Sequence, residues 1–218
     1  MDFGVNFSYL LKVFGSLVII IDPVAVVPMF LLLTKGDTPE HKKSVALRST
    51  FIASGVLFLF AILGDGLLKA LDISEPAFRI AGGLLLLFAA IDMVVVKDSG
   101  IRSTTQDENK EAVKKPDISV FPLAIPLIAG PGAMTALVMH MRAEESAGFL
   151  MQGLILVILF LVLAFNYICL LCADRLAKIL GVTGTNVITR VFGIILAAMA
   201  IQFMLNGTAL FINSFKGA

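Results

Sequence analysis

One carboxylate and two prolines lie in the middle of a long apolar segment. Apolar residues run from about Phe7 to Leu33, and Asp22, Pro23 and Pro28 fall near the centre of that run. A segment of this length crosses a bilayer, so Asp22 should lie near the midplane, where an acid costs about 2.5–3.5 kcal/mol on insertion scales. Acids at that depth are usually retained for a function, such as binding a cation or carrying a proton.

Pro23 and Pro28 should break this helix at the depth of Asp22. Neither proline has an N–H, so the carbonyls of Ile19 and Val24 lose their usual helical partners. A carbonyl freed within the bilayer must face protein or a water-filled cavity. The pattern therefore predicts a small-solute transporter whose binding site is built at a broken helix.

A second apolar segment carries a similar interruption. Residues 125–133 read Ile-Pro-Leu-Ile-Ala-Gly-Pro-Gly-Ala, which cannot form a continuous helix. A helix that restarts after Gly130 presents unpaired N–H groups and the positive end of its dipole, and both suit a carboxylate. Asp22 and the freed carbonyls would hold an ammonium group or an exchanging proton. The two breaks together predict a site for a small zwitterion.

The candidate substrate-binding residues at the two breaks are small and mostly neutral. They are Asp22, Pro23, Ala25, Val26, Pro28, Gly130, Pro131, Gly132, Ala133 and Thr135. Asp22 is the candidate for proton coupling, and Thr135 is the candidate for a hydroxyl contact. Two structural alternatives stay open: the prolines make ordinary kinks, or Asp22 caps the helix that begins at Pro23.

Composition excludes several functional classes. The 218 residues are 58% hydrophobic and 15% charged, which is not the composition of a soluble globular domain. A net charge of +1 without a basic stripe offers no case for nucleic-acid binding. Cys169 and Cys172 lie in an apolar segment and are expected to be buried, reduced thiols. No catalytic constellation, metal site or cofactor motif is visible, so we expect no enzyme and no cofactor.

Six windows have the length and apolar character of membrane spans. They are Phe7–Leu33, Ser44–Leu68, Pro76–Val96, Val120–Met139, Phe149–Cys172 and Thr189–Ile212. Residues 97–118 form the only long polar stretch and are expected to be a cytoplasmic connector. This connector divides the chain into residues 1–96 and 119–218, with three spans each. Gly181-Val182-Thr183-Gly184 is expected to be a loop before the last span.

The two halves resemble each other. Arg79-x-x-Gly82 recurs as Arg190-x-x-Gly193, and Asp22-Pro23 corresponds to the Gly-Pro pair at positions 130–131. Because three is an odd number, halves of three spans each must insert in opposite orientations. The fold expected is all-α, with six transmembrane helices in two inverted three-helix repeats and with helices 1 and 4 broken.

The basic residues predict the orientation in the membrane. The side that carries both termini holds Lys12, Lys69, Arg79, Arg142 and Lys216, and the other twelve of the 17 Lys and Arg residues lie on the opposite side. Cytoplasmic loops carry an excess of Lys and Arg, so both termini are expected outside the inner (plasma) membrane.

The remaining polar residues have structural interpretations at this stage. His41 and His140 are expected near water and are not spaced as metal ligands. Asn166, Gln202 and Asn206 are expected to form hydrogen bonds between helices, and Gly82 and Gly193 to permit close helix contacts.

The string Phe121-Pro122-Leu123-Ala124-Ile125-Pro126-Leu127-Ile128-Ala129-Gly130-Pro131-Gly132-Ala133 resembles the MarC family of bacterial and archaeal inner-membrane proteins. The stretches at 77–83 and 186–207 are also similar to that family. In the first span, Asp22-Pro23 and Pro28 fit a family pattern resembling D/N-P-x-G-x-x-P. This chain has Ala25 where glycine is common and Val26 where a polar residue is frequent, which indicates a less polar site.

The resemblance implies a six-span protein with inverted repeats. Archaeal members called SnatA transport small neutral amino acids such as glycine and alanine, driven by the proton gradient. The expected partners are therefore a small neutral amino acid, protons and the lipid bilayer, with a homo-oligomer left open. The alternatives are an exporter of another small metabolite or drug, and a membrane scaffold that transports nothing.

Overall fold

The computed structural model describes residues 7–95, 117–143 and 148–216, and these residues form helices and short connections without a strand. The helices in chain order are α1 (Phe7–Ile21), α2 (Pro23–Leu33), α3 (Pro39–Ala70), α4 (Glu75–Val95), η1 (Ser119–Ile128), α6 (Pro131–Ala143), α7 (Phe149–Leu171) and α8 (Ala173–Lys216). Nearly all of the polar connector expected at 97–118 lies outside the described residues.

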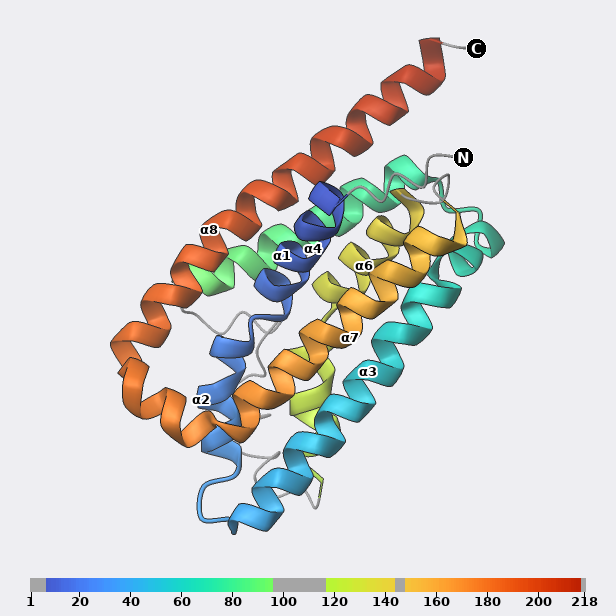
Figure 1. The fold of residues 1–218 in the computed structure, drawn as a ribbon. Helices are drawn as coiled ribbons and strands as arrows, with labels where there is room; N and C mark the ends of the chain where they lie inside the picture. Colours follow the sequence, from blue (N-terminus) through green and yellow to red (C-terminus); the bar gives the residue numbers. More distant parts are fainter. Residues whose placement is uncertain (1–6, 96–116, 144–147, 217–218) are drawn as a thin grey trace.

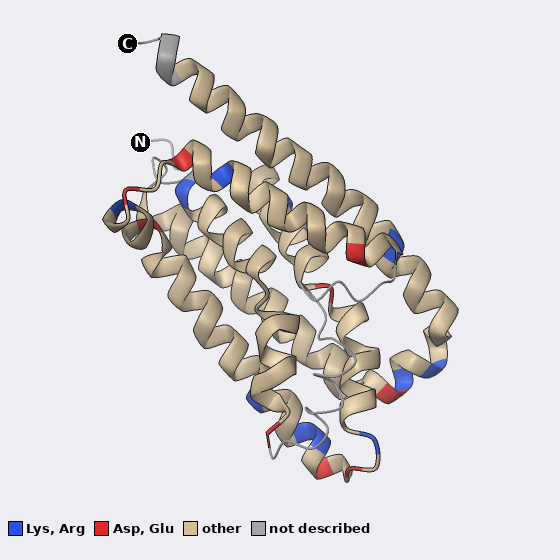
Figure 2. Cartoon of the chain, turned by 180° about the vertical axis from the view of Figure 1, so that it is seen from behind, with Lys and Arg blue, Asp and Glu red and all other residues tan. Residues whose placement is uncertain are grey.

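The helices are long and apolar enough to cross a membrane. Among the described residues, five helical segments meet that criterion, and η1 with α6 forms a bent sixth candidate with a 52° angle. Large apolar side chains face outward from the bundle. Examples are Phe51, Ile62 and Phe160, which are 77%, 62% and 61% exposed. Most charged residues lie toward opposite ends of the bundle, and few lie in the part between them (Figure 2). This is an integral membrane protein with several apolar helices.

Two boundaries differ from the sequence-based expectation. Helix α3 begins at Pro39 instead of Ser44 because Thr38 caps it, accepting a hydrogen bond from the His41 N–H at 3.2 Å. In place of the loop expected at 181–184 there is a kink: α8 comprises two helices that meet at Gly181, where φ 61° and ψ −179° are non-helical. Glycine adopts this positive φ readily, and the first of the two helices ends there.

Elements from the two halves of the chain lie side by side (Figure 1). Helices α4 and α8 are neighbours, and so are α3 and α7. A Cβ on Gly193 of α8 would lie 2.8 Å from the Met93 Cβ and 3.1 Å from the Ala90 carbonyl oxygen. The close helix contact expected at Gly193 is therefore confirmed. At Gly82 the close neighbour is Thr135 of α6.

Candidate functional site at the two helix breaks

Asp22 is the single residue between α1 and α2. Its φ of 47° and ψ of 68° are left-handed, a conformation that Asp tolerates better than most residues. Its Oδ1 accepts a hydrogen bond from the Ala25 N–H at 3.2 Å, and its own carbonyl accepts from the N–H groups of Ala25 and Val26 at 3.1 and 3.3 Å. Asp22 is fully buried. The capping role left open by the sequence is therefore present, and the carboxylate sits at the positive end of α2.

The other candidate residues of the first span follow from this break. Pro23 occupies the first position of α2, where its missing N–H costs nothing. Pro23 and Val26 are buried and Ala25 is half-buried, whereas Pro28 is exposed. Helix α2 continues through Pro28, so the chain breaks only once in this span.

The second break follows an irregular helix. In η1 the Ala129 N–H donates to the Ala124 carbonyl at 2.8 Å, a wider hydrogen-bond ring than in an α-helix. Phe121 and Ile125, which each precede a proline, adopt extended backbone angles. A residue before proline is sterically pushed out of the helical region. The interrupted helix expected at residues 125–133 is present.

Helix α6 restarts with an uncapped N-terminus. Its first bonded N–H is that of Met134, which donates to the Gly130 carbonyl at 3.1 Å. The N–H groups of Gly132 and Ala133 come before it and have no carbonyl within the helix to bind. Gly130 has no side chain to cap them, and a Cβ there would lie 2.8 Å from the Pro126 carbonyl oxygen. This end of α6 is suited to an anionic group.

The two breaks lie at the same level of the bundle. Helix α1 packs on α6, and α2 packs on η1, so the two broken spans run side by side in opposite directions. Ile20, near the end of α1, comes within 3.8 Å of the Cβ position of Gly132. Near-neighbours of both breaks line one small cavity: Ile20, Ala89, Pro126, Leu127, Gly130, Pro131, Gly132 and Ala133. Its volume of about 20 Å³ is close to what one water needs, so this conformation is closed.

Thr135 uses its hydroxyl within its own helix. Its Oγ1 donates to the Pro131 carbonyl at 2.9 Å, and the methyl group packs against Gly82. The residue is buried and does not line the small cavity. Of the candidates on the fourth span, residues 130–133 are thus brought together at the break, whereas Thr135 lies one turn further on.

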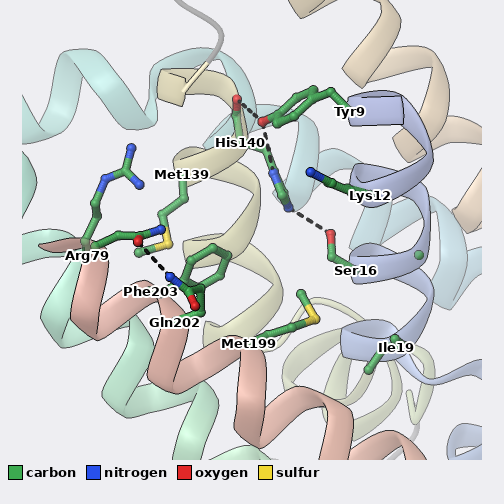
Figure 3. Close-up of a pocket in the computed structure, with 12 residues that line it drawn as sticks. Tyr9, Lys12, Ser16, Ile19, Arg79, Met139, His140, Met199, Gln202 and Phe203 are labelled. Carbon is green, nitrogen blue, oxygen red and sulfur yellow. Dashed lines mark hydrogen bonds between the residues drawn. The ribbon is translucent and has the colours of Figure 1, made fainter. Parts of the chain in front are cut away.

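Sequence reasoning missed a buried histidine. His140 was expected near water, yet only 8% of it is exposed. Its Nε2 lies 2.8 Å from the Ser16 Oγ and its Nδ1 lies 3.2 Å from the Tyr9 hydroxyl (Figure 3). One signal was available, since His140 follows the buried Ala133 and Leu137 at helical spacing.

Three amides also differ from the expectation of hydrogen bonds between helices. The Gln202 Nε2 donates to the Asn206 Oδ1 at 2.8 Å, and both residues belong to α8. Asn166 on α7 is fully buried, and no described residue hydrogen-bonds its side-chain amide. Because α7 packs against α1 and α2, Asn166 is a further polar group next to the first broken span.

Comparison with known proteins places these features in a family. A family described as MarC family integral membrane protein matches residues 7–212. The chain is 38% identical to the UPF0056 membrane protein YvbG of Bacillus subtilis, over 89% of this chain and 92% of the relative. It is 34% identical to a UPF0056 membrane protein of Methanocaldococcus jannaschii, over 93% and 97% of the two chains.

A third relative is the UPF0056 membrane protein YhcE of Escherichia coli, which is 31% identical over 94% of this chain and 93% of the relative. No solved structure matches the chain. The match of the family to nearly the whole length, over both breaks, decides the assignment. The chain belongs to the MarC family of integral membrane proteins.

Proposed function

We propose that the protein is a secondary transporter of small neutral amino acids such as glycine and alanine, coupled to protons. One observation carries this proposal: the uncapped N-terminus of α6 lies beside a broken span whose only acid, Asp22, is buried at the break. One end of the site suits a carboxylate, and the other has the carboxyl group of Asp22.

The geometry of the site favours a small zwitterion. The N–H groups of Gly132 and Ala133 would receive the substrate carboxylate, as helix N-termini do. Asp22 would offset the ammonium group or carry the coupled proton. Ile20 and Ala89 border the same cavity and would limit an opened site to a substrate with a small side chain.

The closed cavity implies a moving part. A volume of about 20 Å³ does not admit glycine, so uptake requires the two broken spans to separate on one side of the membrane at a time. Broken helices allow this because their termini are held by few backbone hydrogen bonds. Pro126 and Leu127 at the end of η1 line the cavity and are the residues whose displacement would open it.

The arrangement of the helices supports an inverted repeat as part of this proposal. Each pair of corresponding elements lies together: the two broken spans, α3 with α7, and α4 with α8. In the proposed topology, residues 1–96 and 119–218 form two halves of three spans each, and both termini lie outside the inner membrane. The excess of basic residues in the loops after spans 1, 3 and 5 supports that orientation.

The experiment is transport by purified protein in proteoliposomes. Uptake of labelled glycine and alanine is measured with and without an imposed pH gradient. Asp22→Asn should abolish the dependence on the gradient because the amide cannot carry a proton. Asp72→Asn is a matched control, because Asp72 also has a positive φ (55°) but is exposed in a loop.

Each outcome decides between the alternatives. Unchanged proton dependence in Asp22→Asn would show that the coupling role of Asp22 is wrong. Transport of other solutes but not of glycine or alanine would favour an exporter of another metabolite. A folded protein that moves no solute would favour the scaffold.

A further inference from the structure

A second cavity, much larger than the one at the breaks, lies between α1, α4, α6 and α8 (Figure 3). Its volume is about 560 Å³, within the range of pockets that bind small organic molecules. It extends along α1 from Tyr9 to Ile19, one residue before the Ile20 that borders the small cavity. Nothing in the proposed amino-acid site uses this space.

The described polar side chains that line this cavity carry positive or no charge. They are Tyr9, Lys12, Ser16, Arg79, His140, Gln202 and Asn206. Arg79 is paired with Glu75 at 2.7 Å, but Lys12 takes part in none of the ion pairs among the described residues. Among the described lining residues, Lys12 is therefore an exposed ammonium group without an ion pair, and none of them is a carboxylate.

The rest of the lining is apolar. It includes the side chains of Ile19, Met139, Met199 and Phe203. An occupant should bring an anionic group for Lys12 and an apolar body for this wall. A free ammonium group on the occupant would find no acid among the lining residues and would be repelled by Lys12.

His140 is held so that it satisfies its hydrogen bonds with or without a second ring proton. The Ser16 Oγ donates to the Val13 carbonyl at 2.9 Å, so its oxygen is left to accept from the His140 Nε2–H at 2.8 Å. The Tyr9 hydroxyl lies 3.2 Å from His140 Nδ1 and 3.3 Å from the His140 carbonyl oxygen. It donates to Nδ1 when the ring is neutral.

When the ring is protonated, the Nδ1–H donates to the Tyr9 oxygen, and the Tyr9 hydroxyl turns to the His140 carbonyl. Neither state leaves a polar atom of the ring without a hydrogen-bond partner, so protonation loses no hydrogen bond. The same two neighbours, Tyr9 and Ser16, thus serve both states. Burial of the ring still opposes its charge, so the added proton needs a nearby anion to offset it.

The charged groups around His140 determine whether its protonation favours the binding of an anion. Helix α1 contributes Lys12, α4 contributes the Arg79–Glu75 pair, and the lining residues of α8 are neutral. Arg142 on α6 is paired with Asp65 of α3 at 3.3 Å. A protonated His140 would add positive charge beside Lys12, and an anion in the cavity would offset both charges. The anion and the proton therefore favour each other's binding.

We propose that this cavity binds an organic monocarboxylate with an apolar body, and that His140 takes up a proton when the carboxylate binds. The site is separate from the two breaks and does not depend on the amino-acid transport proposed above.

The test is thermal unfolding of the purified full-length chain in neutral detergent, titrated with hexanoate at pH 6 and pH 8. Three compounds of similar length serve as comparisons: hexanol, hexylamine and the zwitterion 6-aminohexanoate. Hexanoate alone should raise the melting temperature, and more at pH 6 than at pH 8. Hexanesulfonate, which stays ionised at both pH values, should show the same trend if the proton belongs to the protein.

Variants assign the effect to residues. Lys12→Gln should weaken hexanoate binding about tenfold, as expected for losing one charged partner. Lys35→Gln, an exposed lysine after α2, should leave it unchanged. His140→Gln should keep binding at pH 8 and lose the gain at pH 6. If that variant does not fold, Tyr9→Phe should also lose the gain, because it removes the acceptor for the added proton.

Three results would overturn the proposal. Equal stabilisation by hexanol or hexylamine would mean that apolar contact alone is responsible. Undiminished binding in Lys12→Gln would remove the anion site. Stabilisation by phosphatidylglycerol in nanodiscs, with none by hexanoate, would assign the cavity to an anionic lipid.

Discussion

The two helix breaks interrupt spans of similar composition, but only one of the two helix N-termini that they create is capped by an acidic side chain. At the first break, the Asp22 carboxylate caps α2 and meets its positive end. At the second break, α6 begins after Gly130, which has no side chain, and its first N–H groups stay open. Two positive helix ends therefore meet at one level, and only one of them is already compensated.

This difference assigns the two ends of the proposed site. An anionic group can approach α6, because glycine lets it come close to the backbone. It gains nothing at α2, where Asp22 already occupies the helix end. The asymmetry between the halves, more than their similarity, therefore sets the direction in which a zwitterion would lie.

The largest expected effect is at the first break. Asp22→Ala removes the cap of α2 and puts alanine, which tolerates the left-handed region less well than Asp, at this φ, and together these should lower stability by about 2 kcal/mol. Asp22→Asn keeps an acceptor and tolerates the same φ, so its loss should be much smaller. Denaturation of both variants in detergent checks this. Equal losses would mean that the charge, and not the cap, stabilises the break.

At the second break the expected effect depends on which glycine is replaced. Gly130→Ala forces a β-carbon to 2.8 Å from the Pro126 carbonyl oxygen, a backbone atom that cannot move away easily. We expect a loss of about 1–2 kcal/mol and impaired transport. Gly132→Ala meets only the end of the Leu86 side chain at 3.0 Å and should cost less. Melting temperatures that rank the two variants the other way would contradict this description of the break.

Substitution of Thr135 tests whether its hydroxyl stabilises the start of α6 or contacts the substrate. Thr135→Val keeps the methyl group against Gly82 but removes the hydrogen bond to the Pro131 carbonyl. The expected loss of stability is about 1 kcal/mol, with the substrate affinity unchanged. Thr135→Ser is the control that keeps the hydroxyl. A selective loss of affinity in Thr135→Val would return Thr135 to the substrate site.

The smallest expected effect concerns the start of the fourth span. A hydrogen bond from the Ser119 hydroxyl is the largest cause that lowers the pKa of Asp117 below 3.8, followed by the Ser119 N–H and Arg48. A carboxyl whose pKa is lower in the folded state stabilises the protein above its unfolded pKa, and this stability is lost as the pH falls through the folded pKa.

Ser119→Ala should therefore reduce the stability difference between neutral pH and about pH 3, with Ser8→Ala, an exposed serine of α1, as the control. The comparison is made from melting temperatures across that pH range. An unchanged pH profile would show that Arg48, paired with Asp117 at 2.8 Å, is sufficient.

Local features of the sequence predicted the breaks well. Proline at positions 23, 126 and 131 removes a backbone donor at or next to each interruption. The break expected at Pro28 is absent, since α2 continues through that residue, so a missing donor alone does not decide where a helix ends. The boundaries of α3 and α8 were less predictable. Thr38 and Gly181 act through cap and backbone geometry, which a hydropathy window does not detect.

The sequence by itself determined that the chain is an apolar, multi-helix membrane protein with two interrupted spans, because length, hydropathy and proline chemistry act within one segment. Only the tertiary structure decided which ends meet and which groups they expose. It brought Ile20 of the first broken span to the Gly132 end of the second, and it buried His140 between Tyr9 and Ser16. These outcomes depend on contacts between helices far apart in the chain, and no local pattern encodes which of them will pack together.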